Sequence, residues 1–198
     1  MHTLSNVAVV LINLWIAIHY CRQIVRKKIK PSLAMWIFFT IAVIGSLVTY
    51  LSEGDYKLVD NILNSSDLIL VFSVTTTILI YGDKSSKFTA FDTGCLAAVL
   101  LIMVFWLLTR SHVVAHSLIQ AILVIAYFPV IKRLWNAAEN TESFAAWIGM
   151  MVVAIIALPS NKGALAIVYT VRAVLCTGGL LLLMLRVELK KRSRLREA

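Results

Sequence analysis

The chain has 198 residues, of which 60% are apolar, and its mean hydropathy is +0.87. Soluble domains contain about 45–50% apolar residues, so this composition excludes an ordinary soluble domain and predicts a single polytopic membrane domain. The net charge of +9 does not indicate a nucleic-acid partner, because the basic residues gather in loops and in the tail, as membrane topology requires.

Seven apolar stretches are long enough, or nearly so, to cross a bilayer, which takes about 20 helical residues. In chain order they cover residues 4–23, 33–51, 67–81, 88–108, 113–134, 144–158 and 164–185. Charged residues, Pro or Gly separate them, so no two neighbours form one long helix. We therefore expect an all-α membrane protein with seven transmembrane helices. Residues 52–66, before the third span, fit an interfacial helix and a solvated loop equally well.

Lys and Arg residues predict the orientation of these spans. The loops after the first, third and fifth spans and the tail hold 15 of them, whereas the opposite loops hold 3. Cytoplasmic loops carry the basic excess, so the N-terminus is expected outside and the C-terminus in the cytoplasm of a plasma (inner) membrane. The lipid bilayer is thus an expected partner, and a homo-oligomer is a further option.

One pattern of residues occurs twice. Asn13 lies seven residues before Tyr20, and Gln120 lies seven residues before Tyr127, which is two helical turns on one face in each case. In both copies a Ser four residues before a Trp follows, where the next apolar stretch begins. The pattern predicts two repeats of three spans each.

A single span between the repeats gives them the same orientation. Three spans reverse the direction of the chain, and a fourth restores it, so the repeats become parallel about an axis along the membrane normal. The expected organisation of this single transmembrane domain is a first repeat at 4–82, a linker helix at 88–109, a second repeat at 112–188 and a basic cytoplasmic tail at 189–198.

This 3+1+3 layout resembles the PQ-loop and SWEET transporter superfamily, in a bacterial seven-span branch. The family motif is a Pro-Gln pair at the cytoplasmic ends of the first and fifth spans. Here Tyr127-Phe128-Pro129-Val130 keeps the Pro, and Tyr20-Cys21-Arg22-Gln23 keeps the Gln. Further similar positions are Lys30-Pro31-Ser32, Trp36, Ser46, Tyr50, Phe91-Asp92, Trp106, Thr109 and Glu142-Ser143. The superfamily contains carriers of sugars, amino acids and vitamins.

The resemblance implies a gate or hinge at Tyr20, Tyr127 and Pro129. Pro129 also removes a backbone donor, which frees a carbonyl one turn earlier and bends the helix. An ordinary kink within an interfacial Tyr belt accounts for the same residues.

When the basic residues at the ends of the spans are counted with the loops, Arg172 is the one basic residue left inside a span. A charge at the bilayer centre costs at least about 2.5–3.5 kcal/mol, so Arg172 is expected to face the interior of the bundle. It either binds an anionic substrate group through its forked guanidinium or pairs with a buried acid and locks two spans together. Tyr169 lies one turn earlier on the same face and is expected to line the same space.

Two acids are candidate proton sites. Asp67 is expected to open the third span, where it also suits a helix N-cap, and Asp92 to lie one turn inside the fourth, where an interfacial cap or a local pair with Lys87 is the alternative. Neither matches the expected depth of Arg172, so a direct pair is not expected. Thr75 and Thr76 occupy the middle of the third span, where carriers of this layout bind substrate, although Thr also bonds its own helix backbone.

The remaining polar residues of the spans suggest structural or binding roles. Asn13 and Gln120 either bridge helices or line the substrate pathway. His112 and His116 lack a third ligand, so we expect no metal, and no cofactor motif is present. No span carries a paired acid and base or a nucleophile motif, which argues against an enzyme.

The function that these patterns favour is a carrier of a small polar or anionic metabolite. It would work by alternating access around a central site made of Arg172, Tyr169, Thr75, Thr76, Asn13 and Gln120. A non-transporting receptor or assembly protein of the same fold is the alternative.

Overall fold

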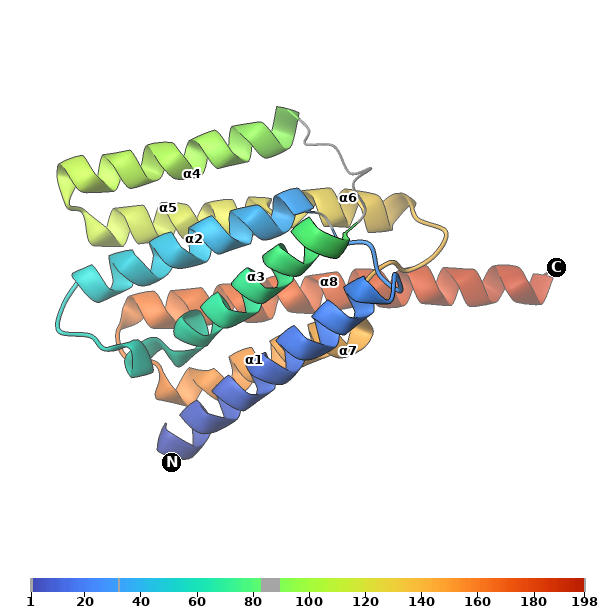
Figure 1. Ribbon diagram of the computed structural model, residues 1–198, viewed down its shortest axis with the longest axis horizontal. Helices are drawn as coiled ribbons and strands as arrows, with labels where there is room; N and C mark the ends of the chain where they lie inside the picture. The colour runs from blue at the N-terminus through green and yellow to red at the C-terminus, as the bar shows by residue number, and fades with distance from the viewer. Residues whose placement is uncertain (1, 32, 83–89, 198) are drawn as a thin grey trace.

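The computed structural model describes residues 2–31, 33–82 and 90–197, and within these ranges the chain is helical without strands (Figure 1). The elements are α1 (His2–Val25), α2 (Leu33–Ser52), the 3₁₀ turn η1 (Leu58–Asn61), α3 (Ile62–Tyr81), α4 (Ala90–Thr109), α5 (His112–Ile125), α6 (Phe128–Asn136), α7 (Phe144–Ala157), η2 (Leu158–Ser160) and α8 (Ala164–Glu197).

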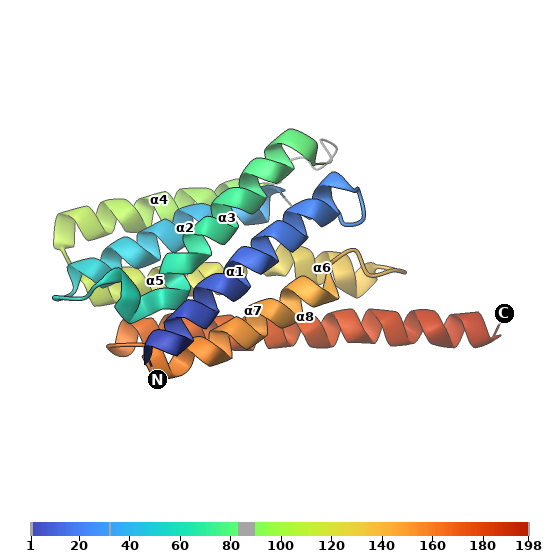
Figure 2. The same cartoon turned by 60° about the horizontal axis from the view of Figure 1, so that its bottom comes forward.

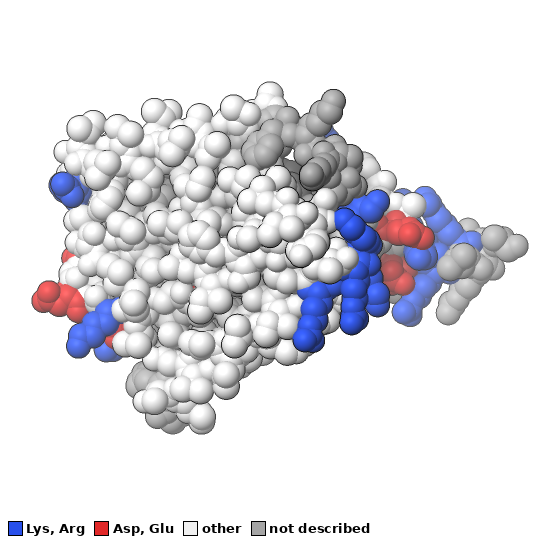
Figure 3. All heavy atoms as spheres, in the orientation of Figure 1, with Lys and Arg blue, Asp and Glu red and all other residues white. Residues whose placement is uncertain are grey.

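Helices of this composition suit a membrane. Five described segments are long and apolar enough to span one, namely Thr3–Val25, Leu33–Ser52, Leu58–Tyr81, His112–Asn136 and Ala164–Arg194, and two shorter apolar segments cover Leu96–Thr109 and Phe144–Ser160. These seven segments overlap the seven predicted stretches. On the face shown in Figure 3, Lys, Arg, Asp and Glu gather at the two ends and leave a wide uncharged band between them. The prediction of an all-α protein with membrane-spanning helices is confirmed at this level.

The start of the third span was predicted wrongly. Helix α3 begins at Ile62, directly after η1, and not at Asp67. Its N-cap is Asn61, whose side chain accepts a hydrogen bond from the backbone N–H of Asn64. The polar run 64–66 suggests a loop in the sequence, yet it is helical because Asn64 and Ser66 bond to side chains on other helices. Asp67 therefore lies inside the helix and does not cap it.

The fifth span is broken into two helices. Helix α5 ends at Ile125, a turn covers Ala126 and Tyr127, and α6 begins at Phe128. Pro129 is the second residue of α6, where a missing N–H costs least. In a continuous helix that N–H would bond the carbonyl of Ile125, so the interruption falls where Pro129 predicts a bend.

Helix α8 is longer than predicted. It covers 34 residues, about 51 Å, and continues through the segment expected to be a separate tail. Arg186 lies 3.9 Å from the ring centre of Trp135, and Lys191 pairs with Glu139 at 3.1 Å, so α6 and the loop after it hold this extension. Figures 1 and 2 show α8 projecting past the other helices, with the two chain termini at opposite ends. We call the end of the bundle from which α8 projects the tail end, and the other the N-terminal end.

The helices of the bundle form two groups. In the first group α3 packs against both α1 and α2, and in the second α8 packs against α5, α6 and α7. Between the groups, α1 packs on α7 and α2 packs on α5. Helix α4 lies at the edge of the bundle, against α5 and α2 (Figures 1 and 2).

Candidate functional site

An internal cavity of about 60 Å³ lies where the two groups of helices meet. That is room for about two water molecules. Most of its lining is apolar, from α2, α3, α5, α7 and α8. The ionisable or hydroxyl-bearing residues that line it are Asp67, Tyr127, Tyr169, Arg172 and Thr177.

Asp67 is held at the cavity by neutral donors. The amide nitrogen of Asn13 on α1 donates to Asp67 Oδ1 at 2.8 Å and to Ser66 Oγ at 2.7 Å. The hydroxyl of Tyr169 on α8 donates to Asp67 Oδ2 at 2.7 Å. Asp67 thus links α1, α3 and α8, and both of its oxygens accept hydrogen bonds from groups without charge.

Arg172 is held in the same way by neutral groups. Its Nε donates to Gln120 Oε1 on α5 at 3.1 Å, and its guanidinium carbon lies 4.7 Å from the ring centre of Tyr169. The described residues form four ion pairs, none of which includes Arg172 or Asp67. Two opposite charges therefore border one cavity without a direct ion pair, and Tyr169 contacts both.

Gln120 extends the network to α2. Its amide nitrogen lies 2.9 Å from Ser46 Oγ and 3.2 Å from His116 Nε2, and His116 Nδ1 lies 3.1 Å from Thr49 Oγ1. His116 is fully buried. Sequence reasoning considered His116 only as a metal ligand, although its spacing of four residues from Gln120 placed both on one helical face. His112, by contrast, accepts a hydrogen bond from Trp106 on α4.

Two of the predicted site residues, Thr75 and Thr76, are not part of this network. Thr75 is buried against α2, where its hydroxyl lies 2.9 Å from Thr40 Oγ1 and donates to the carbonyl of Trp36 at 3.1 Å. Thr76 is exposed on the outer face of α3. The side chain of Asp92 lies outside the described residues, as does that of Pro129.

Aromatic side chains cover the cavity on the side of the tail end. Trp36 and Phe39 on α2 and Tyr127 in the α5–α6 turn line it directly. Ring centres are 5.2 Å apart for Tyr20 and Trp36, 5.3 Å for Phe39 and Tyr127, and 5.9 Å for Tyr127 and Trp147. The repeated Tyr and Trp residues of the sequence thus meet in one cluster at the junction of the two groups.

Glu142 ties this aromatic cluster to the tail end. It is only 4% exposed, and its Oε2 accepts from Tyr20 Oη at 2.8 Å and from Trp147 Nε1 at 3.2 Å. Its Oε1 pairs with Arg133 on α6. Glu142 was not predicted as a site residue, although it lies directly before the repeated Ser and Trp and after a basic stretch.

A second set of bonds closes the N-terminal end. Lys162 pairs with Asp60 at 2.6 Å, and the backbone carbonyl of Lys162 accepts from Tyr50 Oη at 2.9 Å. Tyr56 stacks on Tyr50 with ring centres 4.8 Å apart. The cavity consequently lies between two ends of the bundle that these side-chain bonds hold together.

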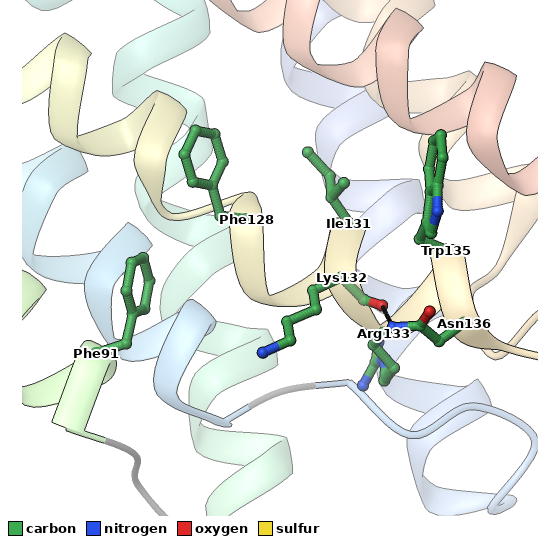
Figure 4. A pocket seen from close by; sticks show the side chains of 7 residues that line it. All are labelled: Phe91, Phe128, Ile131, Lys132, Arg133, Trp135 and Asn136. Carbon is green, nitrogen blue, oxygen red and sulfur yellow. Dashed lines mark hydrogen bonds between the residues drawn. The ribbon is translucent and has the colours of Figure 1, made fainter.

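A larger hollow of about 1040 Å³ lies at the surface between α4 and α6 (Figure 4). Phe128, Ile131 and Trp135 line it along one side of α6, Phe91 faces them from α4, and Lys132 reaches across the opening. It contains none of the predicted substrate-binding residues. Its apolar side chains are exposed, which suits contact with lipid.

No protein-family model, no curated protein and no solved structure matches this chain. Fold and site together define a helical membrane protein with a polar network around a small internal cavity. The described residues contain no group of three or more His, Cys, Asp or Glu arranged to hold a metal ion.

Proposed function

We propose that this protein is a carrier that moves a small polar or anionic metabolite across the membrane by alternating access. The observation that carries the proposal is Arg172, which lies in a spanning segment, borders an internal cavity and forms no ion pair with any described acid. An arginine at that depth is costly, and its fork of donors suits a carboxylate or a phosphate. A purely structural arginine would be expected to contact a carboxylate of the protein itself.

The packing of the helices supports the 3+1+3 repeat in this proposal. In each group the third helix packs against the other two, as α3 does in the first group and α8 in the second. The contacts between the groups are reciprocal, because the first helix of each lies on the second helix of the other. Parallel repeats about an axis along the membrane normal have this arrangement. Membership of the PQ-loop and SWEET superfamily, which the sequence resembles, is likewise part of this proposal.

Alternating access then requires the two closed ends to open in turn. The tail end opens when Glu142 separates from Tyr20 and Arg133, and the N-terminal end opens when Asp60 separates from Lys162. The turn between α5 and α6 is the hinge that the first movement would use. Asp67 is the proposed proton site if transport is coupled to protons.

The proposal is tested by thermal unfolding of purified protein with a panel of small carboxylates, amino acids, sugars and phosphates. A ligand at about 100 times its Kd stabilises by about 2.7 kcal/mol. We expect an anionic compound to stabilise the wild type and not Arg172→Gln. Lys190→Gln, which removes an exposed positive charge from the tail, should respond like the wild type.

Uptake of the same compound into proteoliposomes then separates the carrier from a receptor. Saturable uptake by the wild type, lost in Arg172→Gln, supports the carrier. Binding without uptake would indicate a receptor. An Arg172→Gln protein that is strongly destabilised, together with a wild type that no anion stabilises, would assign Arg172 a structural role.

A further inference from the structure

Each helix group contains a hydrogen bond between a side-chain amide and a charged residue, and the charge is negative in the first group and positive in the second. In the first group the amide of Asn13 on α1 donates to Asp67 on α3 at 2.8 Å. In the second group Arg172 on α8 donates to the amide of Gln120 on α5 at 3.1 Å. Each bond joins an amide on the first helix to an ionisable residue on the third. An amide can serve both, since its nitrogen donates to a carboxylate and its oxygen accepts from a guanidinium.

Asp67 and Arg172 attract each other across the cavity but form no direct ion pair. Among the described residues, Asp67 accepts hydrogen bonds from Asn13 and Tyr169, and Arg172 bonds to Gln120 and stacks on Tyr169. No ion pair among the described residues includes either of them. Both border the same cavity, so each faces the one space that a ligand could enter. Both residues are partly buried, so a ligand that carries one positive and one negative group would pair directly with each of them across the cavity.

We infer that the substrate is a zwitterion, a small molecule that carries an amino group and an acidic group on neighbouring atoms. This inference rests on the proposed carrier function and narrows its substrate class. The acidic group binds Arg172, and the ammonium group binds Asp67. Tyr169 lies between the two charged ends of the ligand and contacts both residues that hold it.

At about 60 Å³ the cavity is too small for an amino acid, so the ligand would enter only when one end of the bundle opens. The apolar part of the lining would then contact it. Leu63, Val71 and Leu123 border the cavity and suit an apolar side chain rather than a polyhydroxyl compound. Asn13 is 1% exposed, and its Oδ1 is buried without a partner among the described residues.

Two matched series of compounds test the inference by calorimetric titration of the purified protein. The first is L-alanine, propionate, which lacks the amine, and ethylamine, which lacks the carboxylate. The second is L-leucine, 4-methylpentanoate and 3-methylbutylamine. We expect one of the two amino acids to bind wild type at least about tenfold more tightly than either of its partial analogues, since each lost charge contact removes that much affinity.

Substitutions then assign the two ends of the ligand. Asp67→Asn should abolish the preference for the amino acid over the carboxylate, while affinity for the carboxylate stays within about twofold. Arg172→Gln should abolish the preference over the amine, and Lys190→Gln should change neither. If Asp67→Asn does not fold, the ratio of wild-type affinities for the amino acid and for its two partial analogues decides the inference.

The outcomes separate this inference from the carrier itself. A carboxylate that binds wild type as tightly as its amino acid overturns the zwitterion and leaves an anion carrier. Absence of binding by both series also overturns it. An amino acid that binds with the expected ratios but is not taken up by proteoliposomes supports the zwitterion site and refutes transport.

Discussion

Single polar residues connect neighbouring helices, because their side chains can both donate and accept hydrogen bonds. Asn13, Gln120 and Tyr169 each contact a charged residue and can donate or accept as that charge requires. These residues were predictable as site candidates, because a polar side chain inside an apolar span must find partners across the bundle. What was not predictable is which partner each one takes.

Thr75 shows why some candidates could not be assigned from the sequence. A threonine satisfies its hydroxyl with nearby backbone as readily as with a ligand. Thr75 bonds to Thr40 and to the carbonyl of Trp36, and Thr76 points outward. The rotation of α3 about its axis decides which threonine faces the bundle. Three consecutive threonines point in three directions around the helix, so the sequence does not show which one is buried.

Gly163 permits the turn that leads into α8. Its φ is +80°, and a Cβ atom there would lie 2.6 Å from Tyr56 Oη. The left-handed backbone alone costs about 1–2 kcal/mol for other residues. We expect Gly163→Ala to lower the free energy of unfolding by at least about 1–2 kcal/mol, measured by thermal unfolding in detergent.

Gly179 provides the matched control for Gly163. A Cβ there meets no atom within 4 Å, and the residue is interior to α8. Gly179→Ala should therefore stabilise the helix by about 0.5–1 kcal/mol. Equal stability of the two variants would contradict the assignment of Gly163 to the left-handed region.

At the scale of elements, apolar length predicted which helices exist better than where they begin. All seven stretches recur as apolar helical segments, because hydropathy over about 20 residues is a strong signal. Helix α3 begins five residues before the predicted start because tertiary hydrogen bonds satisfy its polar first turns. Helix α8 outlasts its apolar part because a basic, amphipathic continuation still packs on α6.

The break between α5 and α6 makes a prediction about backbone dynamics. Pro129→Ala supplies the N–H that the carbonyl of Ile125 lacks, so the two helices can become continuous. One added helical hydrogen bond of about 1 kcal/mol should slow amide exchange across residues 125–131 about fivefold. Hydrogen–deuterium exchange measures this change directly. As a control, Pro159→Ala at the other end of the bundle should not alter the exchange of these amides. If Pro129→Ala does not slow their exchange either, the proline does not cause the break.

At the scale of the whole molecule, the basic residues predict one orientation in the membrane. Replacing Cys21, Cys95 and Cys176 by Ser gives a background for single cysteines. A cysteine at the exposed position of Glu53 should react with a membrane-impermeant maleimide in intact cells. A cysteine at the exposed position of Lys190 should react only after lysis. The reverse pattern would place the tail end outside and refute the predicted orientation.

Helix α8 also acts as a rigid lever for measurement. Arg172 lies near its start and residue 197 near its end, so a tilt of about 10° at the site displaces the far end by about 6–7 Å. Trp135 and Glu139 contact the part of α8 around Arg186 and Lys191. A fluorescent protein or a fiducial domain fused without a flexible linker would therefore convert a small rearrangement around the cavity into an optical or image-contrast signal outside the bilayer.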